Sequence, residues 1–200
     1  MATTLVSEMS LEEMCRQLLS VAVRDGLVST RDGVVPTDLS CGDLVGMANY
    51  LSVLFTANLT VRKVKVNRNR SPQEAIEATG RTQYTDRQVV NAMPKGEGDE
   101  AEIVFFKPDL SERNSFISDD DLEKEFELRG LKPADPVSVA AVNEADPAFA
   151  DQVPHGTHWK DDKGNWCHVT FHLWFDEREV CVGRGYGGWH DDAYFAGVRK

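Results

Sequence analysis

The fold is decided near the C-terminal end, by the stretch Trp166-Cys-His-Val-Thr-Phe-His-Leu-Trp-Phe175. In a β-strand, successive side chains point to opposite faces of the sheet. One face of this stretch is apolar and predicts the core side of a strand: Cys167, Val169, Phe171, Leu173 and Phe175. The other face carries rings and polar groups that cannot all be core: Trp166, His168, Thr170, His172 and Trp174. The stretch therefore predicts a strand with a platform exposed for binding.

The sequence around this strand has an unusual composition. All four tryptophans and all five histidines lie within residues 155–190. Large amphipathic rings supply much contact area at a low cost in rotamer entropy. Glycines and short acids crowd beside them: Gly183, Gly185, Gly187, Gly188, Asp191 and Asp192. This composition is typical of a ligand-binding surface.

Length and charge limit the class of protein. The chain has 200 residues, 41% of them hydrophobic, and a formal net charge of -11. One domain with a small appendage fits that length, and the negative charge repels nucleic acid and anionic membranes. Residues 1–27 lack the pattern of a signal peptide, and residues 44–59 are too short and too polar to span a bilayer. We expect a cytoplasmic protein that neither binds nucleic acid nor inserts into membranes.

The cysteines give weak signals. Cys15, Cys41, Cys167 and Cys181 have no C-x-x-C spacing, and reduced thiols are the expectation for a cytoplasmic protein. Pairing of Cys167 with Cys181 stays open, since it requires only that their strands be neighbours.

The first half of the chain predicts two segments. Helical patterns over residues 10–25 and 39–55 predict a small N-terminal unit, residues 1–59, which could form a homo-oligomer. Residues 60–96 are expected to connect it to the rest. In that segment, valines alternating with lysines and arginines over 60–70 predict an edge strand. Ser71-Pro72 starts a helix, and a further short helix covers 85–93.

From residue 97 onward the pattern is more regular. A buried strand is expected at 101–107, a helix from Ser118 to Arg129, and a helix from Pro136 to Ala145. Strands follow at 157–160, 166–175, 179–184 and 193–199, with Asp176-Glu177 as a tight reversal. The helix that starts at Ser118 begins with three acids: Asp119, Asp120 and Asp121. Because acids stabilise a helix N-terminus, they are interpreted as partners of the helix dipole.

Enzyme chemistry has little support in the sequence. His168 and His172 share a strand face about 13 Å apart at roughly 3.3 Å per residue, too far to hold one zinc ion between them. No nucleophile, phosphate-loop or metalloprotease motif occurs. We therefore assign no catalytic residue, no metal ligand and no cofactor. A metal-dependent hydrolase that uses His155, His158 and nearby acids stays open as an alternative.

Two phrases carry a family resemblance. The chain resembles variable proteins of diversity-generating retroelements at its end, Tyr194-Phe-Ala-Gly-Val-Arg-Lys200. It also resembles them in the wording Asn143-Glu-Ala-Asp-Pro-Ala-Phe149, followed by Gly156-Thr-His-Trp-Lys160 and Gly164-Asn-Trp-Cys167. The order strand, helix, helix and antiparallel strands, with a last strand free to pair with the first, resembles a C-type lectin-like fold. The resemblance implies an α+β class with that domain at residues 97–200.

The resemblance also implies a function, that of a non-catalytic ligand-binding protein. In that family, a reverse transcriptase rewrites adenines in chosen codons near the 3′ end of the gene. Such codons never come to encode Glu, Gln, Lys, Met or Trp, so Trp166, Trp174 and Trp189 would be scaffold, with Trp189 also counted in the contact surface. The expected contact set for a protein or other macromolecular ligand is His168, Thr170, His172, Phe175, Gly183, Gly185, Tyr186, Gly187, Gly188, Trp189, His190, Asp191, Asp192 and Tyr194. A virus-encoded structural or host-interaction protein is a further alternative. Replacing His168, His172, Tyr186 and His190 together is expected to leave the melting temperature nearly unchanged.

Overall fold

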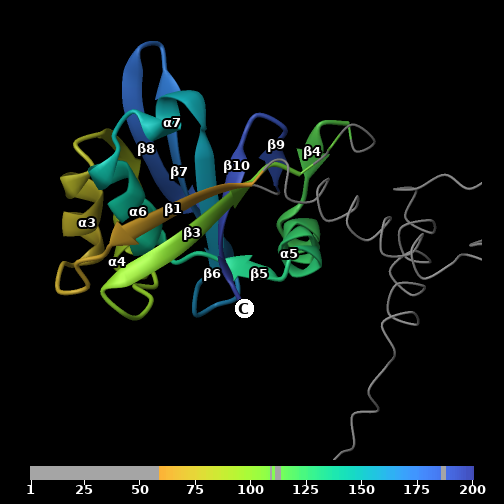
Figure 1. Ribbon diagram of the computed structural model, residues 1–200, viewed down its shortest axis with the longest axis horizontal. Helices are drawn as coiled ribbons and strands as arrows, with labels where there is room; N and C mark the ends of the chain where they lie inside the picture. Colours follow the sequence, from red (N-terminus) through yellow and green to blue (C-terminus); the bar gives the residue numbers. More distant parts are fainter. Residues whose placement is uncertain (1–58, 109, 111–113, 186–187) are drawn as a thin grey trace, which may run out of the picture. The chain divides into compact units, whose positions relative to one another are not determined.

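One large mixed sheet organises the residues that the computed structural model describes, which are 59–108, 110, 114–185 and 188–200 (Figure 1). The predicted N-terminal helices at 10–25 and 39–55 lie outside these residues, and so do Tyr186 and Gly187. The described residues form an α+β fold, the class that the resemblance implies.

The strand order places the C-terminal half at the centre of the sheet. The order is β1 (Thr60–Lys65), β3 (Glu100–Phe106), β10 (Tyr194–Arg199), β6 (His155–Lys160), β7 (Trp166–Trp174), β8 (Glu177–Arg184) and β2 (Thr82–Thr85), while β5 (Leu131–Pro133) pairs with β10. Most neighbours are antiparallel, and the β10–β6 and β2–β8 pairs are parallel. A separate two-stranded sheet joins β4 (Phe116–Ile117) to β9 (Trp189–His190).

Two expectations about strand pairing are confirmed. The last strand of the chain, β10, pairs antiparallel with β3, the strand expected at 101–107. The lysine-rich strand β1 lies at the edge of the described sheet, where it pairs with β3. Charged side chains on such an edge discourage pairing with other chains.

The two faces of the sheet are covered by different elements. We call the side that carries Val169 and Phe171 the core face; α3 (Pro72–Ala78), α4 (Arg87–Asn91), α6 (Pro136–Ala145) and α7 (Phe149–Gln152) pack on it. The opposite side, which carries His168 and Thr170, is the pocket face. Helix α5 (Asp119–Leu128), β4 and β9 cover its β3–β10 part, and Figure 1 shows α5 on the other side of the sheet from α3 and α6.

Side-chain caps fix the starts of the helices where the sequence predicts them. Ser71 and Glu74 form a capping box at the start of α3. Ser118 accepts from the backbone N–H of Asp121, and Asp135 accepts from that of Ser138. Each cap satisfies an N–H that has no partner inside the helix.

Residues 60–96 are not a connection between units. They contribute β1, α3, β2 and α4 to the same sheet and the same core, with Ile76 and Val90 fully buried. Strand β2 was not predicted. The segment is built into the fold because its valines and Ile76 bury against the core face of strands that come much later in the chain.

The reversal between β7 and β8 lies one residue earlier than the sequence predicts. Phe175 and Asp176 have positive φ angles of 45° and 64°, as in a two-residue hairpin turn. Phe175 therefore leaves the strand and its expected core face, and it is 89% exposed. The corrected turn sets the register, which pairs Thr170 with Cys181 and His172 with Glu179.

None of the helices in the described part of the chain combines the length and the apolar composition that crossing a bilayer requires.

Candidate ligand-binding site

A pocket of about 420 Å³ opens on the pocket face, between strand β7 and the segment around β9. Its floor is the ring-bearing side of β7, and Trp174 also lines it. The alternation predicted for this strand is confirmed from Trp166 to His172: Cys167, Val169 and Phe171 are buried, while Trp166, His168, Thr170 and His172 are half-buried. It is wrong at Leu173, which is expected on the core face but is 38% exposed, because the strand is leaving the core as it approaches the hairpin turn. The β7 side chains are thus held firmly by the sheet and are still reachable from solvent.

Most of the described contact residues meet at this pocket. Eight of them line it: His168, Thr170, His172, Gly185, Gly188, Trp189, His190 and Asp192. They come from β7, from the residues just after β8 and just before β9, and from β9 and the turn after it. Segments that are separate in the sequence are therefore brought to one place by the β7–β8 hairpin and by the pairing of β9 with β4.

Four expected contact residues lie away from the pocket. Phe175 is at the tip of the hairpin turn, and Asp191 is exposed beside the pocket without lining it. Gly183 lies beneath His168, where an added Cβ would be 3.6 Å from the ring carbon Cε1. Tyr194 packs against the hydrophobic core of the core face, because its position in β10 alternates with that of Phe195.

The wall of the pocket is fixed by a buried hydrogen-bond network. Asp119 Oδ1 accepts from the indole Nε1 of Trp189 at 2.8 Å and lies 2.7 Å from His158 Nδ1. The other ring nitrogen, His158 Nε2, lies 2.8 Å from Glu123 Oε1. Since a carboxylate only accepts, both ring nitrogens donate, and His158 is an imidazolium. We call Asp119, Glu123, His158 and Trp189 the clamp.

Electrostatics support this protonation state. Burial alone would lower the pKa of His158, but hydrogen bonds to Asp119 and Glu123 and their negative charges outweigh it, so the pKa is raised. Burial would raise the pKa of Asp119, yet hydrogen bonds from His158 and Trp189 and the charge of His158 hold it below its usual value. The ring of His158 also stacks on Trp166, with centroids 4.5 Å apart.

The clamp corrects the interpretation of Asp119. The sequence predicts that Asp119, Asp120 and Asp121 serve the dipole of α5, and Asp120 is indeed exposed at the first turn. Asp119 instead is buried and joins α5 to β6 and β9. Helical periodicity cannot reveal this role, because both partners lie in strands more than thirty residues away.

The two histidines of the hydrolase alternative do not share a site. They lie on opposite faces of β6, since they are three residues apart in a strand. His158 belongs to the clamp, whereas His155 is buried in the hydrophobic core of the core face. There His155 Nδ1 lies 2.6 Å from the carbonyl of Val153 and Nε2 lies 2.9 Å from Asn143 Nδ2. Burial lowers the pKa of His155 to about 4, so the ring is neutral at pH 7.

Two of the remaining tryptophans have different roles: Trp189 is buried and supports the pocket, and Trp174 is exposed at its surface. Trp189 is buried against Phe195, with ring centroids 5.1 Å apart. Trp174 is 57% exposed and contacts Phe175 at the hairpin. Of the tryptophans interpreted as scaffold, Trp189 is therefore a frame residue, and Trp174 contributes surface to the pocket.

Position 188 requires glycine because a side chain there would clash with its neighbours. Its φ of +149° is one that other residues rarely adopt, and an added Cβ would lie 2.4 Å from the carbonyl oxygen of Ile117. A larger residue at this position requires the backbone around β9 to move. Gly188 therefore lines the pocket through its backbone.

Cys167 and Cys181 are both free. They lie on opposite faces of the sheet, since Cys167 alternates with Val169 on the core face and Cys181 pairs with Thr170 on the pocket face. A disulfide between them is excluded by this arrangement.

A second, more open hollow of about 970 Å³ is lined in part by Arg68, Asp135, Glu123 and Trp166. None of the contact residues that the structure describes lines it. Its buried charges already have partners within the protein; Arg68 and Asp135, for example, form an ion pair at 2.7 Å.

Comparison with models of protein families, with curated proteins and with solved structures finds no match to this chain.

Proposed function

We propose that this protein is a non-catalytic ligand-binding protein, a variable protein of a diversity-generating retroelement with a C-type lectin-like domain. The observation that carries the proposal is the pocket on the pocket face. Residues chosen from sequence alone as contacts, and drawn from three separate segments, line one concave surface. A surface of this kind suits a protein or other macromolecular ligand, because rings provide contact area and short polar groups provide adaptable hydrogen bonds.

The fold supports the proposal in two respects. Helices α5 and α6 follow β3 in the chain, with the short strands β4 and β5 and the four-residue helix α7 beside them, and the last strand returns to pair with β3. Apart from these short elements, the order is the one expected of a C-type lectin-like domain. The later strands and the loops after them line the pocket, as the resemblance implies for a surface whose codons are rewritten.

The alternation of buried and pocket-lining residues along β7, and of buried residues along the neighbouring β8, also supports the proposal. Val169, Phe171, Val180 and Val182 alternate with the pocket residues and are at most 2% exposed. Buried side chains carry the stability, so the residues between them can change at low cost. A diversified surface needs this separation, because every new sequence must still fold.

A pair of codon libraries tests this separation. The first varies His168, Thr170, His190 and Asp192 with codons of the form NNC, which reproduce changes at both adenines of AAC. We expect most members to fold and to lose no more than about 0.5 kcal/mol per site. The measurement is the fraction of each library that resists protease when displayed on cells.

The matched control library applies the same codons to Val169, Phe171, Val180 and Val182 on the core face of the same strands. Polar substitutions and cavities there cost about 2–5 kcal/mol each, so few members should fold. Equal loss of folded protein in both libraries would contradict the proposal, because the pocket residues would then be structural.

A further inference from the structure

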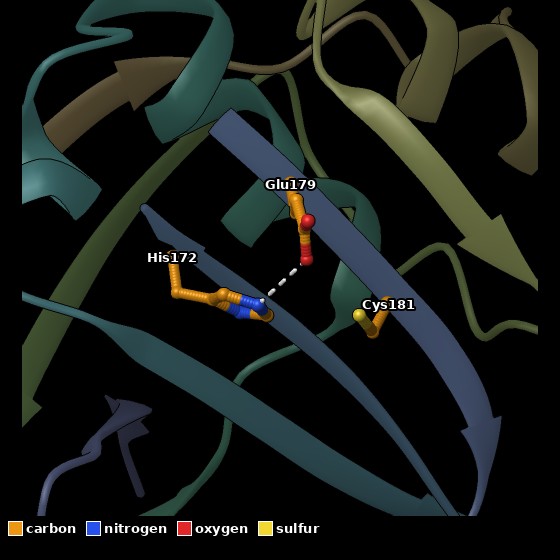
Figure 2. Close-up of side chains that lie close together, drawn as sticks. All are labelled: His172, Glu179 and Cys181. Atoms are coloured by element: carbon orange, nitrogen blue, oxygen red, sulfur yellow. Dashed lines mark hydrogen bonds and ion pairs between the residues drawn. The ribbon is translucent and has the colours of Figure 1, made fainter. Parts of the chain in front are cut away.

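A group of potential metal ligands lies at the edge of the pocket. His172 on β7 and Glu179 and Cys181 on β8 each offer one ligand atom, and these atoms all lie within 4.8 Å of one another. Figure 2 shows the three side chains on two neighbouring strands, with the imidazole, the carboxylate and the thiol directed toward a common region. The register places Glu179 directly opposite His172, and Cys181 follows on the same face.

We propose that His172, Glu179 and Cys181 bind one zinc ion. Zinc accepts nitrogen, oxygen and thiolate ligands together, and three protein ligands with an open fourth position form a common zinc geometry. Calcium and magnesium prefer oxygen ligands alone, so the imidazole and the thiol argue against them.

The distances suit such an ion. His172 Nε2 lies 3.2 Å from Glu179 Oε2. Two ligand atoms bonded to tetrahedral zinc at about 2.0–2.1 Å stand about 3.3 Å apart, so this pair needs almost no movement. The sulfur of Cys181 lies within 4.8 Å of the other two ligand atoms, and the hydrogen bond between Cys181 and Thr170 would be exchanged for the bond to the metal.

The backbone of the site is braced from the core face. The buried guanidinium of Arg81 donates to the carbonyl of His172 at 3.1 Å and to that of Glu179 at 3.5 Å. The side chains of His172 and Glu179 are only 26% and 12% exposed. Ligands held in position before the ion arrives lose little conformational freedom on binding it.

The protonation state of Cys181 couples zinc binding to pH. Zinc binds cysteine as the thiolate, so the Cys181 thiol must give up its proton when the ion binds. Zinc binding would release that proton, and the affinity should therefore rise with pH.

The position of the site suggests a use for the ion. His172 also lines the ligand pocket, so an ion bound by His172 would offer its fourth coordination position to an oxygen or nitrogen of a ligand at the pocket edge. This role alone rests on the proposed function; zinc binding itself is independent of it.

The test is a titration of the full chain, freed of metal and reduced, with zinc followed by calorimetry and with cobalt followed by absorption. We expect one ion per chain at this site and a thiolate-to-cobalt charge-transfer band. Cys181→Ser should abolish the band, and His172→Gln and Glu179→Gln should each weaken zinc binding by about 100-fold or more, beyond the loss typical of outer-shell changes. The matched control, His190→Gln, removes a histidine from the same pocket and should leave both signals unchanged.

Circular dichroism of each variant separates loss of the site from loss of the fold, and two ligand variants besides Cys181→Ser keep the test informative if that one misfolds. No thiolate band with the native chain, or zinc binding that survives in all three variants, would overturn the proposal. These outcomes leave the library experiment untouched, since that library does not vary the three ligand residues.

Discussion

Asp119→Asn should lower the free energy of unfolding by roughly 3 kcal/mol, near the low end of the range for breaking a buried ion pair. The substitution removes the charge that faces the buried imidazolium of His158 and weakens the acceptor of the Trp189 indole. The asparagine oxygen can still accept one hydrogen bond, which limits the loss. Chemical denaturation followed by fluorescence measures the change.

The control for this variant is Asp120→Asn, the same substitution at the next residue of the same helix turn. Asp120 is exposed, and loss of its charge near the helix N-terminus should cost less than about 1 kcal/mol. Equal effects of the two variants would contradict the clamp and restore the dipole interpretation of all three acids.

The effect of Asp119→Asn should also depend on pH. Because the pKa of His158 is raised above its ordinary value of 6.5, the folded state gains stability below pH 6.5 and loses it as the pH rises through the folded-state pKa. Because the pKa of Asp119 is lowered below its ordinary value of 3.8, the folded state gains stability above pH 3.8 and loses it as the pH falls through the folded-state pKa. The difference between the two asparagine variants should therefore be largest between about pH 4 and 6.5, and it should shrink on either side.

Trp189→Ala should cost about 3–5 kcal/mol, the usual range for removal of a buried aromatic side chain. The ring packs on Phe195 and reaches His158 and His168, and its N–H is bonded to Asp119. Its loss opens a cavity beneath the pocket and leaves the clamp without one donor. Trp189→Phe keeps most of the packing and should cost about 1–3 kcal/mol, the penalty for an unpaired buried acceptor.

Trp174→Ala is the matched control, since this ring is more than half exposed on the same side of the molecule. We expect a change within about 0.5 kcal/mol. If Trp174→Ala destabilised the protein as much as Trp189→Ala, the distinction between frame and surface tryptophans would be contradicted.

Local signals made much of the fold predictable. Caps at Ser71, Ser118 and Asp135 locate three helices, because side-chain capping depends only on neighbouring residues. Alternation correctly separates core from surface from Trp166 to His172 and fails at Leu173, next to the turn. The same alternation identified half-buried side chains of β7 that now line the pocket, so this part of the candidate site could be found without coordinates.

Long-range pairing could not be predicted in the same way. The short strands β2, β4 and β9 carry no pattern of their own and form because a distant strand supplies partners. Moving the β7–β8 turn by one residue changes every pairing between the strands by two positions. Spacing along a single strand therefore cannot show that His172, Glu179 and Cys181 lie together, because two of them are on the neighbouring strand. The role of Asp119 cannot be predicted for the related reason that its partners are remote in the chain.

The central claim is that the pocket was diversified by rewriting of adenines, and its most direct test is on DNA. The measurement is the sequence of the codons for Trp166 to Lys200 together with several kilobases of flanking genome. We expect a near-copy of this segment beside a reverse transcriptase gene. The two copies should differ at adenines in codons of pocket residues such as His168, Thr170 and His190, and agree at Val169, Phe171 and Trp189. Absence of a near-copy, or differences concentrated in the codons of the core face, would contradict the account.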